Sequence, residues 1–568
     1  MRLHYAIATS LLLSAFTTLH AQTFKSLSKV QKAIVSLNTY DKNGNLLHSG
    51  TAFYTGKNGE AVADFAIFKG AYKASVIDMN GKKADIDCIL GADDTYSIVK
   101  FKVATKGNAV LNTATAQCDN GTTIYAVPFS KEKVKTCKSS VIESATPVQE
   151  KYSYYTLIDD ADSAQIGSPL FNGNGELIGI LQPSIKGKGY ALDIRFIDEL
   201  KIKAISTSSA NIALNAINIP KGLPDNLEEA LVYAYFKSRS ANNDEYMDIM
   251  NRFVSTYPDN AEGYLRRSTP LTDLCRFDEA DADLNKYISL STDKATAHYN
   301  VAQAVLNKLK YMPQPEYAKW THDYANELID KSIALFTASN DTAHIKSSKI
   351  LKAQILTERK DYNDAINIYD ELASMPGNNT PSIHYAKSLV CELRGDSIKD
   401  IIAILDSAIA LFPTPHPREA ANYVLRRGRL YNNIGMPRKA VLDYNEYCYL
   451  MNNQVSAIFY YDRSQIEMQA HMYQQAYEDI TNAINGAPNN LDYKIEKAGM
   501  CLRFSYIDEC IDLCNQALTV IPDDVTALRI LGYAQLQKGN KETARTTLQR
   551  AIDLGDELSK DIMNKYFK

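Results

Sequence analysis

The stretch YVLRRGRLYNNIGMPRKAVLDYNEY, residues 423–447, sets the architecture of the larger part of this chain. It places small residues at Gly428 and Ala440 and large ones at Tyr444 and Tyr447, at spacings that suit two successive helices. Small residues at a crossing let two helix backbones approach, while larger residues fill the groove beside it. The stretch therefore predicts a pair of antiparallel helices.

The same pattern recurs along the chain. It returns with Ala476, Ala483 and Pro488, and again with Ala544 and Ala551. Copies of the small position are separated by 33 to 36 residues where they are neighbours, at Ala234, Ser268, Gly428, Ser464, Gly499 and Gly532. A period of this length indicates stacked two-helix units. We expect an all-α solenoid of about nine repeats over residues 226–568, closed by a polar helix from Glu557 to Lys568.

This period and these small and large positions resemble the tetratricopeptide repeat. The resemblance implies an extended concave surface, lined by the first helix of each repeat, that binds proteins or peptides. Counting from the small positions gives six candidate binding residues: Arg429, Asn432, Asn433, Tyr461, Gln465 and Arg503. A solvated helix face is the alternative interpretation of the same residues.

Residues 29–203 have a different texture. Short alternating or β-branched runs such as AIVSLNTY and TTIYAVPF are separated by turns that contain Asn-Gly, as in DKNGN. Such runs and turns are typical of antiparallel β structure, in a barrel or a sandwich. The following stretch, 205–225, has neither period and ends near Gly222 and Pro224, so we expect a linker there.

Three segments of the β region occur in a fixed order: GTAFYTGKNGEAVADFAIFKGA from Gly50, DDTYSIVKFKV from Asp93 and AQIGSPLFNGNGELIGI from Ala164. Together they resemble the trypsin-like serine proteases of the high-temperature-requirement type. The last segment is the most specific, because it matches a strand, a turn and the next strand. The resemblance implies an all-β double barrel over residues 22–204.

The same resemblance locates the three catalytic positions, and none of them carries the required residue. The histidine position falls on Ala66, the aspartate position on Ser97 and the nucleophilic serine position on Ile166. A triad needs an imidazole to take the serine proton and a carboxylate to orient that imidazole. We therefore expect no catalytic residue in this domain.

A divergent serine endopeptidase that recruits its substrate through the repeats is the alternative. Ser163 and Ser168 flank Ile166, and Asp64 lies near Ala66. The only histidine between residues 22 and 205 is His48, which precedes the GTAF strand, where the family places no catalytic group. The alternative therefore lacks a base.

Residues 1–21 carry Arg2, an apolar run from Ala6 to Phe16, and Ala21 before Gln22. This is the pattern of a cleavable signal peptide, so we expect a periplasmic or secreted protein with no membrane segment after cleavage. Nine cysteines then imply at least one free thiol, and Cys118 and Cys137 are candidates for a bond.

Composition excludes several classes of function. The net charge is −4 and the basic residues are scattered, so no nucleic-acid footprint is present. No cofactor motif and no metal-ligand spacing occurs. The sequence favours a non-catalytic adaptor or scaffold of the bacterial cell envelope that binds proteins or peptides. A structural part of an envelope or secretion assembly is a third hypothesis.

Overall fold

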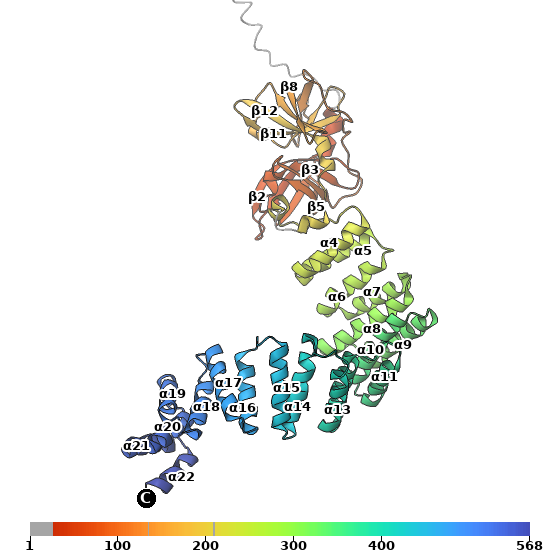
Figure 1. Cartoon of the computed structure of the whole chain (residues 1–568). Coiled ribbons are helices and arrows are strands. Elements are labelled where there is room, and N and C mark those ends of the chain that lie inside the picture. Colours follow the sequence, from red (N-terminus) through yellow and green to blue (C-terminus); the bar gives the residue numbers. More distant parts are fainter. Residues whose placement is uncertain (1–26, 135, 208–210, 568) are drawn as a thin grey trace, which may run out of the picture. The chain divides into compact units, whose positions relative to one another are not determined.

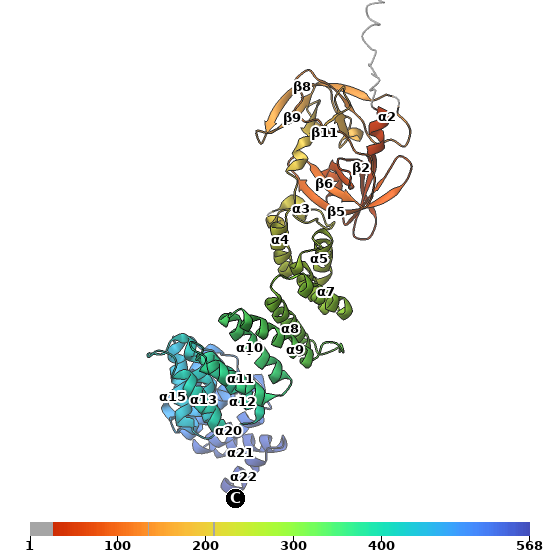
Figure 2. The same ribbon diagram turned by 90° about the vertical axis from the view of Figure 1, so that its right-hand side faces the viewer.

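The computed structural model describes residues 27–134, 136–207 and 211–567. These residues form two compact units, one up to Thr292 and one from Asp293 (Figures 1 and 2). The first unit contains the strands and four helices of the repeat region, and the second contains helices. The expected signal peptide, residues 1–21, lies outside the described residues.

The first six strands close into a barrel. They are β1 (Ile34–Tyr40), β2 (Leu46–Tyr54), β3 (Glu60–Asp64), β4 (Lys73–Ile77), β5 (Lys83–Asp93) and β6 (Ile98–Val103). All neighbours are antiparallel, in the closed order β1-β2-β3-β6-β5-β4. Fully buried Leu37, Phe53 and Phe101 belong to its core.

The next six strands repeat this arrangement. They are β7 (Thr123–Ala126), β8 (Lys138–Val148), β9 (Tyr152–Leu157), β10 (Pro169–Phe171), β11 (Leu177–Ile185) and β12 (Lys188–Asp193). Their closed antiparallel order is β7-β8-β9-β12-β11-β10, which is the strand order of the first barrel. The predicted trypsin-like double β-barrel is therefore confirmed.

The Asn-Gly turns that predicted these hairpins share one local structure. Gly44 and Gly175 adopt φ of +84° and +83°, in the left-handed region that glycine reaches at little cost. Each turn is fixed by the polar side chain that begins it. Asp41 Oδ1 accepts from the backbone N–H of Asn45 at 2.8 Å, and Asn172 Oδ1 accepts from that of Glu176 at 3.0 Å.

The stretch expected to be a linker is largely packed against the first barrel. It contains η5 (Ala204–Thr207) and α3 (Ile212–Asn215). Ile217 and Ile219 are both 2% exposed and belong to the same hydrophobic cluster as the barrel core. The alternation of these two isoleucines extends over too few residues to register as a strand in a sequence pattern.

Backbone hydrogen bonds hold this segment in place. Asn218 donates to the carbonyl of Ala71 at 2.8 Å. On β5, Ile89 donates to the carbonyl of Pro220 at 2.9 Å and accepts from Gly222 at 2.8 Å. The segment therefore extends the barrel at β5 and is not a free spacer.

Four helices complete the first unit: α4 (Leu227–Ser240), α5 (Asn243–Thr256), α6 (Ala261–Asp273) and α7 (Phe277–Leu290). Tyr233 of α4 and Ile249 of α5 are buried in the cluster that contains the barrel core. Arg252 of α5 donates to Asp87 of β5, to its Oδ2 at 2.7 Å and to its carbonyl at 2.9 Å. The first helix pair is thus joined to the barrel by apolar packing and by an ion pair.

The second unit consists of helices in sequence. Seven successive pairs are α8 (Lys294–Tyr311) with α9 (His322–Ala338), α10 (Thr342–Glu358) with α11 (Tyr362–Ser374), α12 (Pro381–Arg394) with α13 (Ile398–Ile409), α14 (Ala421–Asn433) with α15 (Pro437–Leu450), α16 (Ala457–Gln469) with α17 (Tyr473–Gly486), α18 (Leu491–Arg503) with α19 (Ile507–Val520), and α20 (Val525–Gln537) with α21 (Lys541–Asp553). The last described helix is α22 (Glu557–Tyr566). The predicted helical solenoid is confirmed.

The small residues of the repeat pattern are buried where the helices of a pair cross. Ala440, Ala476 and Ala544 are 0% exposed. One position was assigned wrongly from the sequence: Ala498 is the buried small residue of α18, whereas a Cβ added at Gly499 would find its nearest atom, Ile530 Cδ1, at 3.8 Å. Both residues are small, so residue type alone could not separate them.

The cysteines are free thiols, and Cys118 and Cys137 are not joined. The bond considered for that pair is therefore absent. Within residues 27–567 as described, no helix has the length and apolar character needed to cross a membrane.

Candidate functional site

The three positions expected for a catalytic triad lie on separate loops of the double barrel. Ala66 is in η2 (Phe65–Phe68), Ser97 directly precedes β6, and Ile166 follows η3 (Ser163–Gln165). Their side chains offer a methyl group, a hydroxyl and a branched alkyl group. None of the three supplies the imidazole that a serine-protease triad requires.

Asp64 is the residue at which these loops meet. Its Oδ1 accepts from Ser97 Oγ at 2.5 Å and from the backbone N–H of Ala66 at 2.9 Å. Asp64 is buried, and a Cβ added at Gly167 would lie 3.3 Å from its Cβ. The fold thus brings the three expected positions together around a carboxylate, without an imidazole.

The loop that would stabilise an oxyanion uses its N–H groups internally. In a serine protease the oxyanion is held by the N–H groups of the nucleophile and of the residue two positions earlier, which here are Ile166 and Ala164. Ala164 donates instead to Asp162 Oδ1 at 3.0 Å, and Ile166 donates to the carbonyl of Ser163 at 3.4 Å. Neither N–H group is available to a substrate in this conformation.

The hollow beside this loop is nearly filled. It measures about 20 Å³, and its lining includes Gln165 and the buried side chains of Leu157, Leu170 and Leu181. A space of this size holds about one water molecule. It therefore has no room for a peptide side chain.

The residues that the alternative enzyme hypothesis requires are poorly placed for catalysis. Ser168 is 0% exposed, and its hydroxyl has no hydrogen-bond partner among the described residues. Ser163 is exposed, and His48 lies on the exposed first half of β2. No described contact joins a histidine to either serine.

The six candidate binding residues of the repeats lie on the first helices of three successive pairs. Arg429, Asn432 and Asn433 are on α14, Tyr461 and Gln465 on α16, and Arg503 on α18. Arg429, Asn433 and Arg503 are exposed, and the others are half-buried. These residues therefore stand on neighbouring repeats, and Arg503 was counted from the misassigned Gly499.

Two groups of contacts surround these residues. Arg429 donates to the hydroxyl of Tyr444 and is close enough to Asp462 to lower the pKa of that carboxyl, although burial raises it overall. The rings of Tyr461 and Tyr493 stack at 4.9 Å. The sequence count missed Asp462 because its relation to Arg429 crosses from one repeat to the next.

Two of the six have a buried polar atom without a hydrogen-bond partner among the described residues, namely Asn432 Oδ1 and Gln465 Nε2. Most buried polar atoms in proteins are paired. These two amides therefore have bonding capacity that the chain itself does not use.

A repeated ion pair links the two helices of several repeats. In three of them an arginine directly before the small residue binds an aspartate of the second helix through two N–H groups. The pairs are Arg267 with Asp283, Arg427 with Asp443, and Arg463 with Asp479. The remaining N–H group reaches the second helix of the preceding repeat, at Asn251, Asp406 and Asn445 respectively. Each arginine therefore links the two helices of its own repeat and also contacts the second helix of the preceding repeat.

With this geometry established, comparison with known proteins assigns the helices. The family model described as "Tetratricopeptide repeat" matches residues 526–554, which cover most of α20, the loop after it and α21. Helices α20 and α21 therefore match the tetratricopeptide repeat, and the helix pairs before them follow the same two-helix arrangement.

Two curated rice proteins are similar to part of the chain. They are the DnaJ protein P58IPK homolog A, 26% identical over 127 residues, and homolog B, 25% identical over 127 residues, both from Oryza sativa subsp. japonica. The matched region covers 22% of this chain and spans about a quarter of each relative, 25% and 26%.

Among solved structures, the active form of the Rv3671c protease from M. tuberculosis resembles the chain with a TM-score of 0.28 and 15% identity. The likeness covers 31% of this chain and 82% of the protease. The fold of the barrels rests on their own strand order and not on this overlap.

In the repeat helices, the carboxylate of Glu467 on α16 is buried, which disfavours its charged form. It is 2% exposed, and its Oε2 has no partner among the described residues. Its Oε1 lies 3.9 Å from Arg463 Nε, and that nitrogen already forms an ion pair with Asp479 Oδ2 at 2.5 Å. Burial first, and then the charge of Asp479, raise the pKa of Glu467 to about 8, while Arg463 lowers it.

Glu467 should make the second unit less stable as pH rises. The folded protein holds a proton on Glu467 up to about pH 8, whereas the unfolded chain releases it near pH 4.5, so stability falls between these values. Replacing Glu467 with glutamine should reduce this fall by at least about 1 kcal/mol, because one pKa unit corresponds to about 1.4 kcal/mol. Urea unfolding at pH 5 and pH 8 measures the difference.

The matched control is Glu542→Gln, on the exposed face of α21. It should leave the pH dependence of stability as it is in the wild type. Equal slopes for the Glu467→Gln variant and the wild type would contradict the prediction.

Among the described residues, no group of three or more His, Cys, Asp or Glu side chains is arranged to hold a metal ion.

Proposed function

We propose that this chain is a non-catalytic adaptor or scaffold whose tetratricopeptide repeats bind protein or peptide segments and whose double barrel does not cleave them. The proposal rests on the contacts of the residues at the three positions that the resemblance assigns to a catalytic triad. Ser97 and the backbone N–H of Ala66 both donate to Asp64, no imidazole stands at any of the three positions, and the N–H groups of the loop that contains Ile166 are engaged within that loop.

The repeats support the binding half of the proposal. Stacked repeats offer an extended surface, and proteins bind extended segments on such surfaces. Arg429 supplies an exposed cation, and the half-buried amide side chains of Asn432 and Gln465 stand on α14 and α16. A peptide backbone or carboxylate can accept from the guanidinium, and a peptide backbone can also pair with amide groups.

We place the protein outside the cytoplasm, in the periplasm or beyond the cell. This part of the proposal rests on the basic start, apolar run and Ala21 of residues 1–21. The test is the N-terminal sequence of the protein purified from its own cells, which should begin at Gln22. A protein that begins at Met1 would contradict it.

Binding is tested by capture of partners from extracts of the source cell. The variant Arg429→Ala/Asn432→Ala/Gln465→Ala should lose partners that the wild type retains in constant stoichiometry. The control is Arg545→Ala, an exposed arginine on α21. Retention of all partners by the triple variant would remove these residues from the binding surface.

The absence of catalysis gives a second expected result. A fluorophosphonate, which reacts with activated serines, should label no serine of residues 29–203, because no imidazole activates one. Mass spectrometry of the digested protein reads out the labelling, with an active serine protease in the same tube as the control. Labelling of Ser163 or Ser168 would instead favour the divergent endopeptidase.

A further inference from the structure

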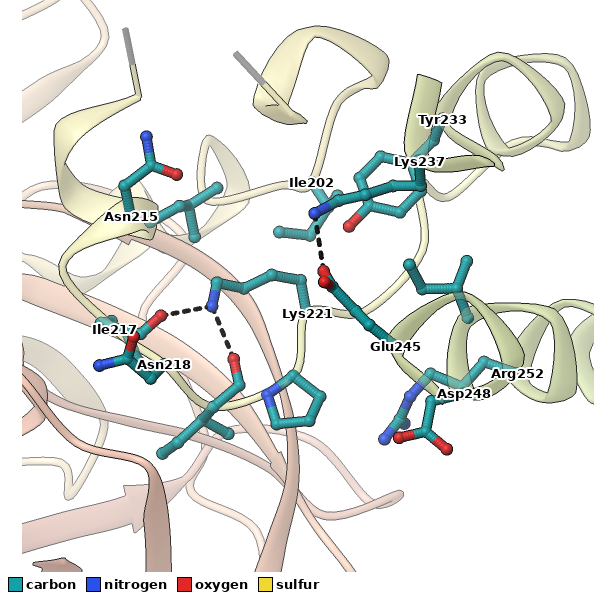
Figure 3. A pocket seen from close by; sticks show the side chains of 14 residues that line it. Ile202, Asn215, Ile217, Asn218, Lys221, Tyr233, Lys237, Glu245, Asp248 and Arg252 are labelled. Carbon is teal, nitrogen blue, oxygen red and sulfur yellow. Dashed lines mark hydrogen bonds and ion pairs between the residues drawn. The ribbon is translucent and has the colours of Figure 1, made fainter. Parts of the chain in front are cut away.

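One feature that the proposed function does not use is a cavity within the first unit, between the segment that ends at Lys221 and helices α4 and α5 (Figure 3). It has a volume of about 330 Å³. Ligand sites for small molecules begin at about 300 Å³. The cavity is therefore large enough for a molecule of amino-acid size.

One wall of the cavity carries an ammonium group without a carboxylate partner. Lys221 Nζ donates to the backbone carbonyls of Ile217 and Ile219, each at 2.6 Å. Within the described part of the chain, no acidic side chain forms an ion pair with it. Burial, assisted by the charge of Lys237, lowers the pKa of Lys221 to about 8. A buried ammonium is costly unless an anion balances it, and its third N–H remains available.

The other wall is acidic. Glu245 and Asp248 stand on α5, both exposed, on the side of the cavity opposite Lys221 (Figure 3). Glu245 pairs with Lys237 at 3.0 Å, and Arg252 beside Asp248 is held by Asp87 at 2.7 Å. Glu245 and Arg252 are therefore already paired, whereas Asp248 forms no ion pair among the described residues, so its carboxylate can attract a positive group.

We infer that this cavity binds a free α-amino acid, with the ligand carboxylate on Lys221 Nζ and its ammonium facing Asp248. A zwitterion matches both walls at once. A simple anion would satisfy Lys221 but would face the acidic wall, and a simple cation would leave Lys221 unbalanced. The bound molecule would contact both the segment at β5 and helix α5, and so would strengthen their junction.

The experiment measures binding of each of the twenty common amino acids to the full-length protein at pH 7, by calorimetry. Acetate, methylamine and inorganic phosphate serve as ligands that carry only one kind of charge. At least one amino acid should bind saturably, and each single-charge probe should bind at least about tenfold more weakly, a factor that corresponds to 1.4 kcal/mol.

Two variants test the assignment of the walls. Lys221→Met should weaken binding about tenfold or more, since it removes the partner of the ligand carboxylate. Asp248→Asn should also weaken binding. Because Asp248 is exposed, this variant should fold even if Lys221→Met does not. The control is Lys201→Met, a half-exposed lysine nearby that pairs with Asp225.

Three results would overturn the inference. They are no saturable binding of any amino acid, equal binding of acetate or phosphate, and binding that survives both Lys221→Met and Asp248→Asn. None of these results bears on partner capture by the repeats, so this inference can fail while the proposed adaptor function stands.

Discussion

Replacing Arg427 with methionine is expected to destabilise the second unit by about 3–5 kcal/mol. Arg427 donates to both carboxylate oxygens of Asp443, at 3.0 and 2.7 Å, and its third group reaches Asp406 at 2.7 Å. The Asp443 side chain is 5% exposed, and burial already raises its pKa although Arg427 lowers it. Without the arginine, a buried carboxylate remains with no counter-charge, which is the costly outcome.

Two further variants separate this cause from a general effect of losing an arginine. Arg550→Met removes an exposed pair with Asp523 and should change the free energy of unfolding by less than about 1 kcal/mol. Arg427→Met combined with Asp443→Leu should recover most of the loss, because no charge is then left buried. Urea unfolding measures all three. A loss for Arg427→Met no larger than that for Arg550→Met would show that the ion pair does not hold the repeat.

The sequence carries a signal for this ion pair in the frame of the repeat. Arg267, Arg427 and Arg463 each stand directly before a small crossing residue, and each has an aspartate at the same distance further along. The repeat period was found from small and large residues, whose role in packing follows from their volume. Polar residues that recur in the same frame mark contacts between helices equally well.

Which residues stand at the three expected triad positions could be predicted, because that depends on residue type alone. The state of the oxyanion loop could not, because it depends on which acceptor each backbone N–H meets. Ala164 bonds to the side chain of Asp162, and Ile166 to the carbonyl of Ser163, only because η3 folds as a tight turn. Ser97 likewise reaches Asp64 from a position distant in the sequence.

The packing of the expected linker could not be predicted for a related reason. Ile217 and Ile219 are buried by strands far earlier in the chain, and the hydrogen bonds of Pro220 and Gly222 go to Ile89. A segment whose partners are so distant shows little local periodicity. Absence of a local pattern therefore indicated a loop, but it said nothing about whether the loop is packed.

A leucine at Gly428 is expected to cost about 3 kcal/mol, at the upper end for an overpacked core. A Cβ at this position would lie 2.9 Å from Asp443 Cβ and 3.0 Å from Tyr444 Cδ2, so α14 and α15 must separate even before the rest of the side chain is placed. The displacement also pulls Asp443 away from Arg427, which adds to the loss.

Gly499→Leu is the matched control, since it also replaces a glycine within the first helix of a repeat. An added Cβ there meets only Ile530 Cδ1, at an ordinary 3.8 Å, and leucine favours a helix over glycine by up to about 1 kcal/mol. Gly499→Leu should therefore be neutral or stabilising, whereas Gly428→Leu should speed amide exchange across residues 421–450. Because each repeat packs only against its neighbours, the protection of backbone amides against exchange should decline most in residues 421–450 and less toward α20 and α21. Similar exchange in both variants would mean that the close contact at Gly428 does not control the spacing of these helices.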